Sequence, residues 1–201
     1  YKAINKDNQE FLVKVIPHIK IAQNSQIQDL LVSEINIQKN VESDHVVRLL
    51  DCKRSPNNLY IFTDYCEEGN LQKKIDQGHI FSEKEACEII LQITKAFISM
   101  GNIMHRDIRP ANIFLSKGKI KVANFYFSKI FDHKETRQQH TLLGTPLYMA
   151  PQLLNEWTES EKCDVYSAGC LFYQLLFGKL PWTGDSVPKI AFNIRTKLLA
   201  F

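Results

Sequence analysis

The stretch His105-Arg106-Asp107-Ile108-Arg109-Pro110-Ala111-Asn112 decides the fold of this chain, and the apolar run Ile113-Phe114-Leu115 follows it directly. The octet places an aspartate five residues before an asparagine in a polar segment, with a cation between them. An aspartate in such a loop can orient a substrate hydroxyl, and the asparagine can help to hold a divalent metal. The octet therefore predicts a polar loop equipped for catalysis.

Length and composition are those of an ordinary soluble globular protein. The chain has 201 residues, 44% of them hydrophobic and 23% charged, which suits one large domain or two small lobes. The 25 Lys and Arg residues exceed the 22 Asp and Glu residues by only 3, and they are dispersed. So small an excess argues against a nucleic-acid partner and against a membrane surface.

The cysteines and the apolar runs indicate an intracellular protein. Neither a C-x-x-C pair nor a metal-ligand spacing occurs among Cys52, Cys66, Cys87, Cys163 and Cys170. An odd number of unpatterned cysteines predicts free thiols in a reducing compartment. No apolar run reaches the ~18 residues of a membrane span, and the first residues lack a signal-peptide pattern. We expect a cytoplasmic domain with no membrane insertion.

The first 65 residues are predicted to be rich in strands. Two strands joined by a polar turn fill residues 1–16, and Pro17 ends the second one, which carries Lys14 within an apolar run. Taken alone, Lys14 could also be a solvated residue on an edge strand. A helix over about 27–37, which carries Glu34, and strands over 46–50 and 59–63 are expected to follow. This order is compatible with an antiparallel sheet.

Helical patterns dominate the remaining residues, 66–201. Ser82-Glu83-Lys84-Glu85 is a capping box that predicts the start of a long helix. The other expected elements are a short helix over 71–77, a hairpin over 113–122, a buried helix over 164–177 and a last amphipathic stretch. Residues 127–152 are polar and weakly periodic, and their length predicts a functional loop.

The octet resembles the catalytic loop of eukaryotic protein kinases, H-R-D-x-x-x-x-N. The resemblance covers nearly the whole chain. The sequence of the octet and of Ile113-Phe114 is most similar to Ser/Thr kinases of the NIMA-related and autophagy-initiating groups. It implies an α+β, bilobal fold with a small antiparallel-sheet N-lobe over 1–65 and a mainly helical C-lobe over 66–201. It also implies that the chain is truncated at both ends, without a glycine-rich loop and without the last C-lobe helices.

The resemblance implies a nucleotide site, with ATP as its ligand. Lys14 matches the lysine that holds the α- and β-phosphates, and Glu34 matches the helix glutamate that pairs with it. The hinge and the adenine site would be formed by Thr63, Asp64, Cys66 and Phe114.

The same resemblance implies a catalytic group and a metal pair. Asp107 matches the catalytic base, which Thr145 supports, and Arg109 stands where the family has a lysine that contacts the transferred phosphate. Asn112 matches the ligand of the second metal, and Asn124 stands where the family has the aspartate of D-F-G.

Two further groups of residues are implied to regulate or support the site. Arg106 could pair with a phosphate on the activation loop. Thr141 is the expected phosphate acceptor, because of its spacing from Gly144-Thr145-Pro146. His105 is expected to pack behind Phe125. Asp164 is expected to begin the buried helix that anchors the catalytic loop.

Departures from the family pattern put activity in doubt. Where the family has D-F-G, this chain has Asn124-Phe125-Tyr126. Mg²⁺ prefers anionic oxygen, so an amide at position 124 should make metal binding weak or absent. Tyr126 replaces a glycine and should restrict the loop. Leu12 adds bulk over the adenine position, Arg109 replaces a lysine, and Gln152 replaces the glutamate of A-P-E.

Two interpretations of function follow. The first is a catalytically impaired pseudokinase that serves as an interaction or scaffold module with a protein partner. The second is an active or weakly active ATP-dependent Ser/Thr kinase that phosphorylates protein hydroxyls and tolerates the asparagine. A non-kinase enzyme that uses Asp107 and His105 has little support.

Overall fold

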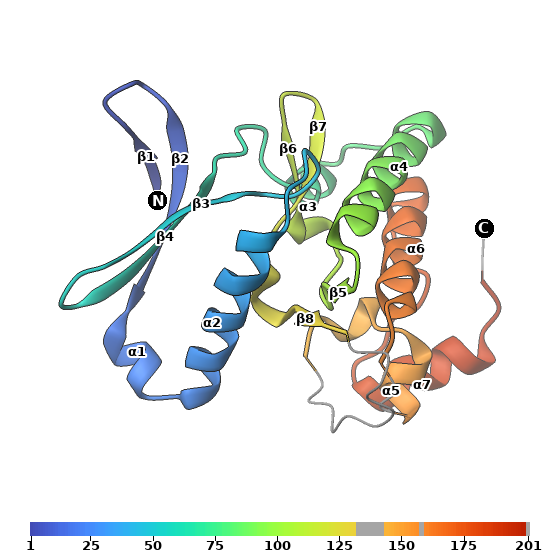
Figure 1. Ribbon diagram of the computed structural model, residues 1–201. Coiled ribbons are helices and arrows are strands. Elements are labelled where there is room, and N and C mark those ends of the chain that lie inside the picture. Colours follow the sequence, from blue (N-terminus) through green and yellow to red (C-terminus); the bar gives the residue numbers. More distant parts are fainter. Residues whose placement is uncertain (132–142, 157–158, 200–201) are drawn as a thin grey trace.

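Four antiparallel strands form the sheet of the first lobe (Figure 1). The computed structural model describes residues 1–131, 143–156 and 159–199. The strands lie in the order β1-β2-β4-β3, with bounds β1 Lys2–Ile4, β2 Glu10–Pro17, β3 Leu49–Arg54 and β4 Asn58–Asp64. β2 lies between β1 and β4. The alternative that Lys14 belongs to an edge strand is therefore wrong.

Two helices connect β2 to β3. The sequence pattern does not predict the first, α1 (His18–Ala22), because five residues are too few to show a helical period. The second, α2 (Ser25–Asn40), begins after Asn24, whose side chain accepts a hydrogen bond from the Gln26 amide. Leu31 of α2 packs against Leu59 and Ile61 of β4, and this contact holds the helix against the sheet.

The strand predicted over 46–50 is wrong in its first half. The Val47 amide donates to the Val122 carbonyl at 2.9 Å, and the Val122 amide donates to the His45 carbonyl at 2.8 Å. Val46 is buried in the core of the second lobe. These contacts hold the segment against β7 (Lys119–Val122), so β3 begins only at Leu49.

Helices make up most of the second lobe: α3 Leu71–Asp76, α4 Glu83–Met100, α5 Pro151–Glu156, α6 Lys162–Phe177 and α7 Val187–Thr196. α4 begins at the predicted capping box, in which the Ser82 hydroxyl accepts from the Glu85 amide and the Glu85 carboxylate accepts from the Ser82 amide. α4 and α6 lie side by side (Figure 1), and Ile93, Ala168 and Leu171 are buried in their shared core.

Short strands and 3₁₀ turns bring the octet to the junction of the lobes. β5 Ile103–Met104 pairs with β8 Lys129–Ile130, and β6 Ile113–Ser116 pairs with β7 as the predicted hairpin. The 3₁₀ turns are η1 Pro110–Asn112, η2 Phe125–Phe127 and η3 Pro146–Tyr148. No helix in the ranges given above is long and apolar enough to cross a membrane.

Candidate active site

Lys14 and Glu34 meet across the first lobe, as predicted. The Lys14 ammonium donates to the two carboxylate oxygens of Glu34 at 3.2 and 2.9 Å. The Glu34 side chain is 5% exposed and that of Lys14 is 41% exposed, so the glutamate is buried while the lysine remains accessible. The Tyr126 ring lies beneath the same ammonium, with its centroid 5.4 Å from Nζ. A cation is therefore held in place at the junction of the lobes.

Asp164, in the first turn of α6, anchors the octet from behind. Its carboxylate accepts hydrogen bonds from the amides of His105 at 2.6 Å and Arg106 at 2.9 Å. Burial raises the pKa of Asp164, and the hydrogen bonds from the two amides oppose that effect. Arg106 takes a left-handed backbone with φ +67°, a conformation that is costly for a side-chain-bearing residue. The anchor fixes the direction in which the following residues point.

Three predicted residues converge on the Asp107 carboxylate. Thr145 Oγ1 donates to Asp107 Oδ1 at 2.8 Å, and Asn112 Nδ2 donates to Asp107 Oδ2 at 2.7 Å. The Arg109 guanidinium lies 3.3 Å from the same Oδ2. A carboxylate with this many donors is held in one orientation. Such a group can orient an incoming hydroxyl.

The two predicted metal ligands face each other. Asn124 Nδ2 donates to Asn112 Oδ1 at 3.3 Å. Asn124 has a left-handed backbone with φ 69° and ψ 68°, which asparagine tolerates better than most residues. Two neutral amides thus stand where two oxygen ligands were expected, and one of them presents its NH₂ group to the other.

His105 is a packed residue and not an exposed catalytic group. Its ring is 0% exposed and makes an edge contact with Phe125 at a centroid distance of 5.0 Å. Nε2 bonds the Ala123 carbonyl at 3.0 Å, and Nδ1 accepts from the Asp107 amide at 3.3 Å. With both ring nitrogens engaged, His105 cannot reach a substrate. This placement removes the basis of the non-kinase interpretation.

The hinge predicted at Thr63, Asp64 and Cys66 joins β4 to the second lobe. Thr63 lies opposite Leu12 in the sheet, and Lys14 lies opposite Ile61. Because side chains alternate along a strand, Thr63 and Leu12 share the face of the sheet that carries Lys14. Phe114 lies on β6, and its backbone forms a bridge with Asn70 just after the hinge.

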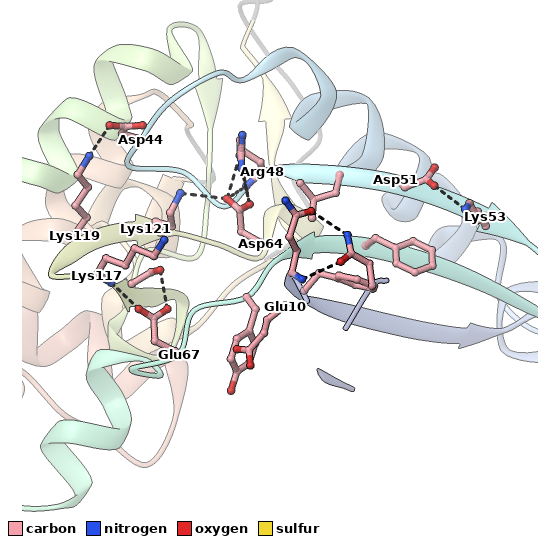
Figure 2. A pocket seen from close by; sticks show the side chains of 17 residues that line it. Glu10, Asp44, Arg48, Asp51, Lys53, Asp64, Glu67, Lys117, Lys119 and Lys121 are labelled. Atoms are coloured by element: carbon pink, nitrogen blue, oxygen red, sulfur yellow. Dashed lines mark hydrogen bonds and ion pairs between the residues drawn. The ribbon is translucent and has the colours of Figure 1, made fainter. Parts of the chain in front are cut away.

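The Asp64 side chain points to the opposite face, into a groove of about 1110 Å³ behind the hinge (Figure 2). There Asp64 accepts from Arg48 at 3.1 Å and from Lys121 at 3.2 Å. Burial opposes its ionisation, but the Arg48 hydrogen bonds and the Lys121 charge lower the pKa of Asp64 overall. The prediction that the backbone of Asp64 and Cys66 contacts adenine stays a prediction.

Arg106, the predicted partner of a phosphate, is paired within the chain. Its guanidinium donates to the carboxylate of Glu159, from the segment between α5 and α6. Thr141, the predicted phosphate acceptor, lies outside the described residues. The sequence offered no signal for Glu159, which is 53 residues away from Arg106 and belongs to none of the quoted motifs.

Comparison with known proteins decides the family. The family model described as "Protein kinase domain" matches residues 1–200. The chain belongs to the protein kinase family. Serine/threonine-protein kinase Nek2 of Homo sapiens is 33% identical over 182 residues, which cover 84% of this chain and 41% of Nek2.

Two further relatives match the kinase domain at similar levels. Serine/threonine-protein kinase ULK3 of Homo sapiens is 31% identical over 201 residues, covering 98% of this chain and 42% of ULK3. Serine/threonine-protein kinase ATG1c of Arabidopsis thaliana is 30% identical over 194 residues, covering 94% of this chain and 26% of ATG1c. The chain therefore spans well under half the length of these relatives. The predicted kinase fold, a sheet-based N-lobe with a helical C-lobe, is confirmed.

Kinases in general use ATP with Mg²⁺. The residues of this domain suit the nucleotide phosphates better than they suit the metal. Lys14, paired with Glu34 and partly exposed, would hold nucleotide phosphates. Asn112 offers an amide oxygen of the kind that can bind Mg²⁺, but Asn124 bonds that oxygen and brings no charge of its own, so the pair fits the metal less well than an asparagine with an aspartate would. Within the described ranges, no three His, Cys, Asp or Glu side chains gather into a metal site.

Proposed function

We propose that this kinase domain is catalytically impaired and acts as an interaction or scaffold module for a protein partner. The observation that carries the proposal is the direct hydrogen bond between the amides of Asn112 and Asn124. Mg²⁺ loses hydration reluctantly and binds where anionic oxygens replace its water. Here the Asn124 amide already bonds the Asn112 oxygen, and neither side chain supplies an anionic oxygen. Nucleotide binding is then weak or independent of metal.

The test is the melting temperature of the protein with ATP, measured with Mg²⁺ and with a chelator. We expect the same small shift, or none, under both conditions. Asn124→Asp restores the anionic ligand and should introduce a shift of several degrees that requires Mg²⁺. The matched control Asn36→Asp makes the same change on the exposed face of α2 and should behave like the wild type. A large Mg²⁺-dependent shift in the wild-type protein would contradict the proposal.

A weakly active Ser/Thr kinase is the second candidate, because the groups around Asp107 are in place. Thr145, Asn112 and Arg109 all contact the Asp107 carboxylate, which can therefore orient a protein hydroxyl. This candidate predicts radiolabel transfer from ATP to a generic protein substrate that disappears in Asp107→Ala. If the wild-type chain transfers no more radiolabel than the Asp107→Ala variant, a weakly active kinase is excluded.

We also propose a reducing, intracellular setting for the domain. The observation that supports this location is that Cys52, Cys66, Cys87 and Cys170 are free thiols. Fluorescence microscopy of the tagged full-length protein tests this, and accumulation in the secretory pathway would contradict it.

A further inference from the structure

The guanidinium of Arg106 lies in a closely packed part of the molecule. Its backbone is fixed by the bond from its amide to Asp164. On the other side, Gly144 lies so close that a Cβ there would come within 2.4 Å of the Arg106 carbonyl oxygen. The loop and the end of the activation segment are thus packed closely against each other at Arg106.

The Arg106 side chain extends to Glu159. The side chains of Arg106 and Glu159 are 14% and 6% exposed, so the pair is largely shielded from solvent. Charges removed from water to this extent require a counter-charge, since an unpaired one would be strongly destabilising. Arg106 Nε is buried and makes no hydrogen bond within the described residues. The Glu159 carboxylate therefore supplies the counter-charge at the Nη2 side of the fork.

The cavity beside this pair is too small for a second anion. A cavity of about 20 Å³ is lined by Arg106, Glu159, Asp164 and Cys163 among others. This volume holds about one water molecule, whereas a phosphate group has four oxygens around phosphorus. A phosphate carries about −1.5 to −2 charge and would also be repelled by Glu159 and Asp164. On this side of Arg106, the Glu159 carboxylate occupies the position that a phosphate would take.

We propose that Glu159 is a built-in counter-ion that occupies the anion position of Arg106. The catalytic loop is then held by the protein's own carboxylate and needs no phosphorylated residue. Removing the carboxylate should convert Arg106 into a binding site for inorganic phosphate. This inference concerns the anchoring of the loop and holds whether or not the domain transfers phosphate.

Thermal unfolding of the whole chain during a titration with inorganic phosphate, at constant ionic strength kept with chloride, tests the proposal. Wild-type protein should show no phosphate effect that depends on Arg106. Glu159→Gln should melt roughly 5–10 °C lower and should regain stability as phosphate is added. The double variant Arg106→Gln/Glu159→Gln should not respond to phosphate. The matched control Glu10→Gln removes the carboxylate of the exposed Lys2–Glu10 pair and should behave like the wild type.

Two results would overturn the proposal. One is a phosphate-dependent stabilisation of the wild type that Arg106→Gln abolishes, which would show that Arg106 is already open to anions. The other is a Glu159→Gln variant that melts like the wild type and ignores phosphate. If Glu159→Gln fails to fold, the double variant decides. Recovery of folding in the double variant supports an uncompensated Arg106 charge as the cause, and failure to recover contradicts it.

Discussion

At the scale of single residues, His105 is held in one protonation state by its surroundings. The Ala123 carbonyl at 3.0 Å requires a proton on Nε2, and the Asp107 amide at 3.3 Å requires a lone pair on Nδ1. A second proton would remove that acceptor and bury a charge. Burial lowers the pKa of His105, against the opposing charge of Asp164. The ring is therefore neutral in the folded protein.

The depressed pKa gives stability a defined dependence on pH. A histidine whose folded pKa lies below its unfolded value of about 6.5 contributes stability that is fully present above that value. The contribution is lost as the pH falls from about 6.5 towards the folded pKa, at up to about 1.4 kcal/mol per pH unit. We expect the free energy of unfolding, measured with urea, to fall more steeply between pH 6.5 and 5 in the wild type than in His105→Gln. The exposed His79→Gln variant should keep the wild-type slope, and equal slopes in all three proteins would contradict the assignment.

At the scale of elements, α2 is held by the segment that follows Asn124. Tyr126 packs into the cluster formed by Leu31 of α2 and the sheet. Ser33 Oγ of α2 donates to the Ser128 carbonyl at 3.4 Å. The tyrosine that replaces the family glycine thus fills space between the lobes and contacts the Lys14 ammonium. The ring therefore lies directly beside the Lys14–Glu34 pair.

Tyr126→Gly should loosen α2. Loss of a half-buried aromatic side chain is expected to lower the free energy of unfolding by about 2 kcal/mol and to speed amide hydrogen exchange along α2. Hydrogen exchange followed by mass spectrometry measures the effect. Tyr65→Ala, a change at the hinge, should leave exchange in α2 unchanged. Unaltered α2 exchange in Tyr126→Gly would show that the ring does not hold the helix.

Elements with strong local signals could be predicted from sequence, and those fixed by distant contacts could not. The capping box located the start of α4, and apolar periodicity located α2 and α6. The position of Val46 and Val47 depends on β7, so no local pattern reveals where β3 begins. In the site, the resemblance to kinases implied that Lys14 meets Glu34 and that Thr145 meets Asp107, and both contacts are present. The Glu159 partner of Arg106 could not be found, because an ion pair between distant loops leaves no spacing rule.

At the scale of the whole molecule, Asp164 joins the core of the second lobe to the junction between lobes. α6 packs against α4 through residues such as Leu171, and its first turn carries the carboxylate that accepts the His105 and Arg106 amides. The position of the catalytic loop therefore depends on a helix whose other contacts lie deep in the core.

Asp164→Ala should destabilise the entire domain. It leaves two amide donors without their acceptor, which costs about 1–3 kcal/mol for each buried group, so the urea midpoint should fall markedly. Asp164→Asn keeps one acceptor oxygen, so its urea midpoint should lie between those of the wild type and Asp164→Ala. Asp185→Ala, an exposed aspartate on a loop, should leave the midpoint unchanged. A midpoint for Asp164→Ala equal to that of the wild type would show that the anchor is dispensable.

The charged contacts behind the hinge bear on how the lobes move. Asp64 ends β4 of the first lobe, and its carboxylate is bound by Lys121 of β7 in the second lobe (Figure 2). Any rotation of one lobe on the other changes the separation of this ion pair. Because the two side chains are only 15% and 14% exposed, salt screens their attraction weakly. The attraction between Asp64 and Lys121 therefore opposes separation of the two lobes at this point, and its strength should change little with the ionic strength of the cell.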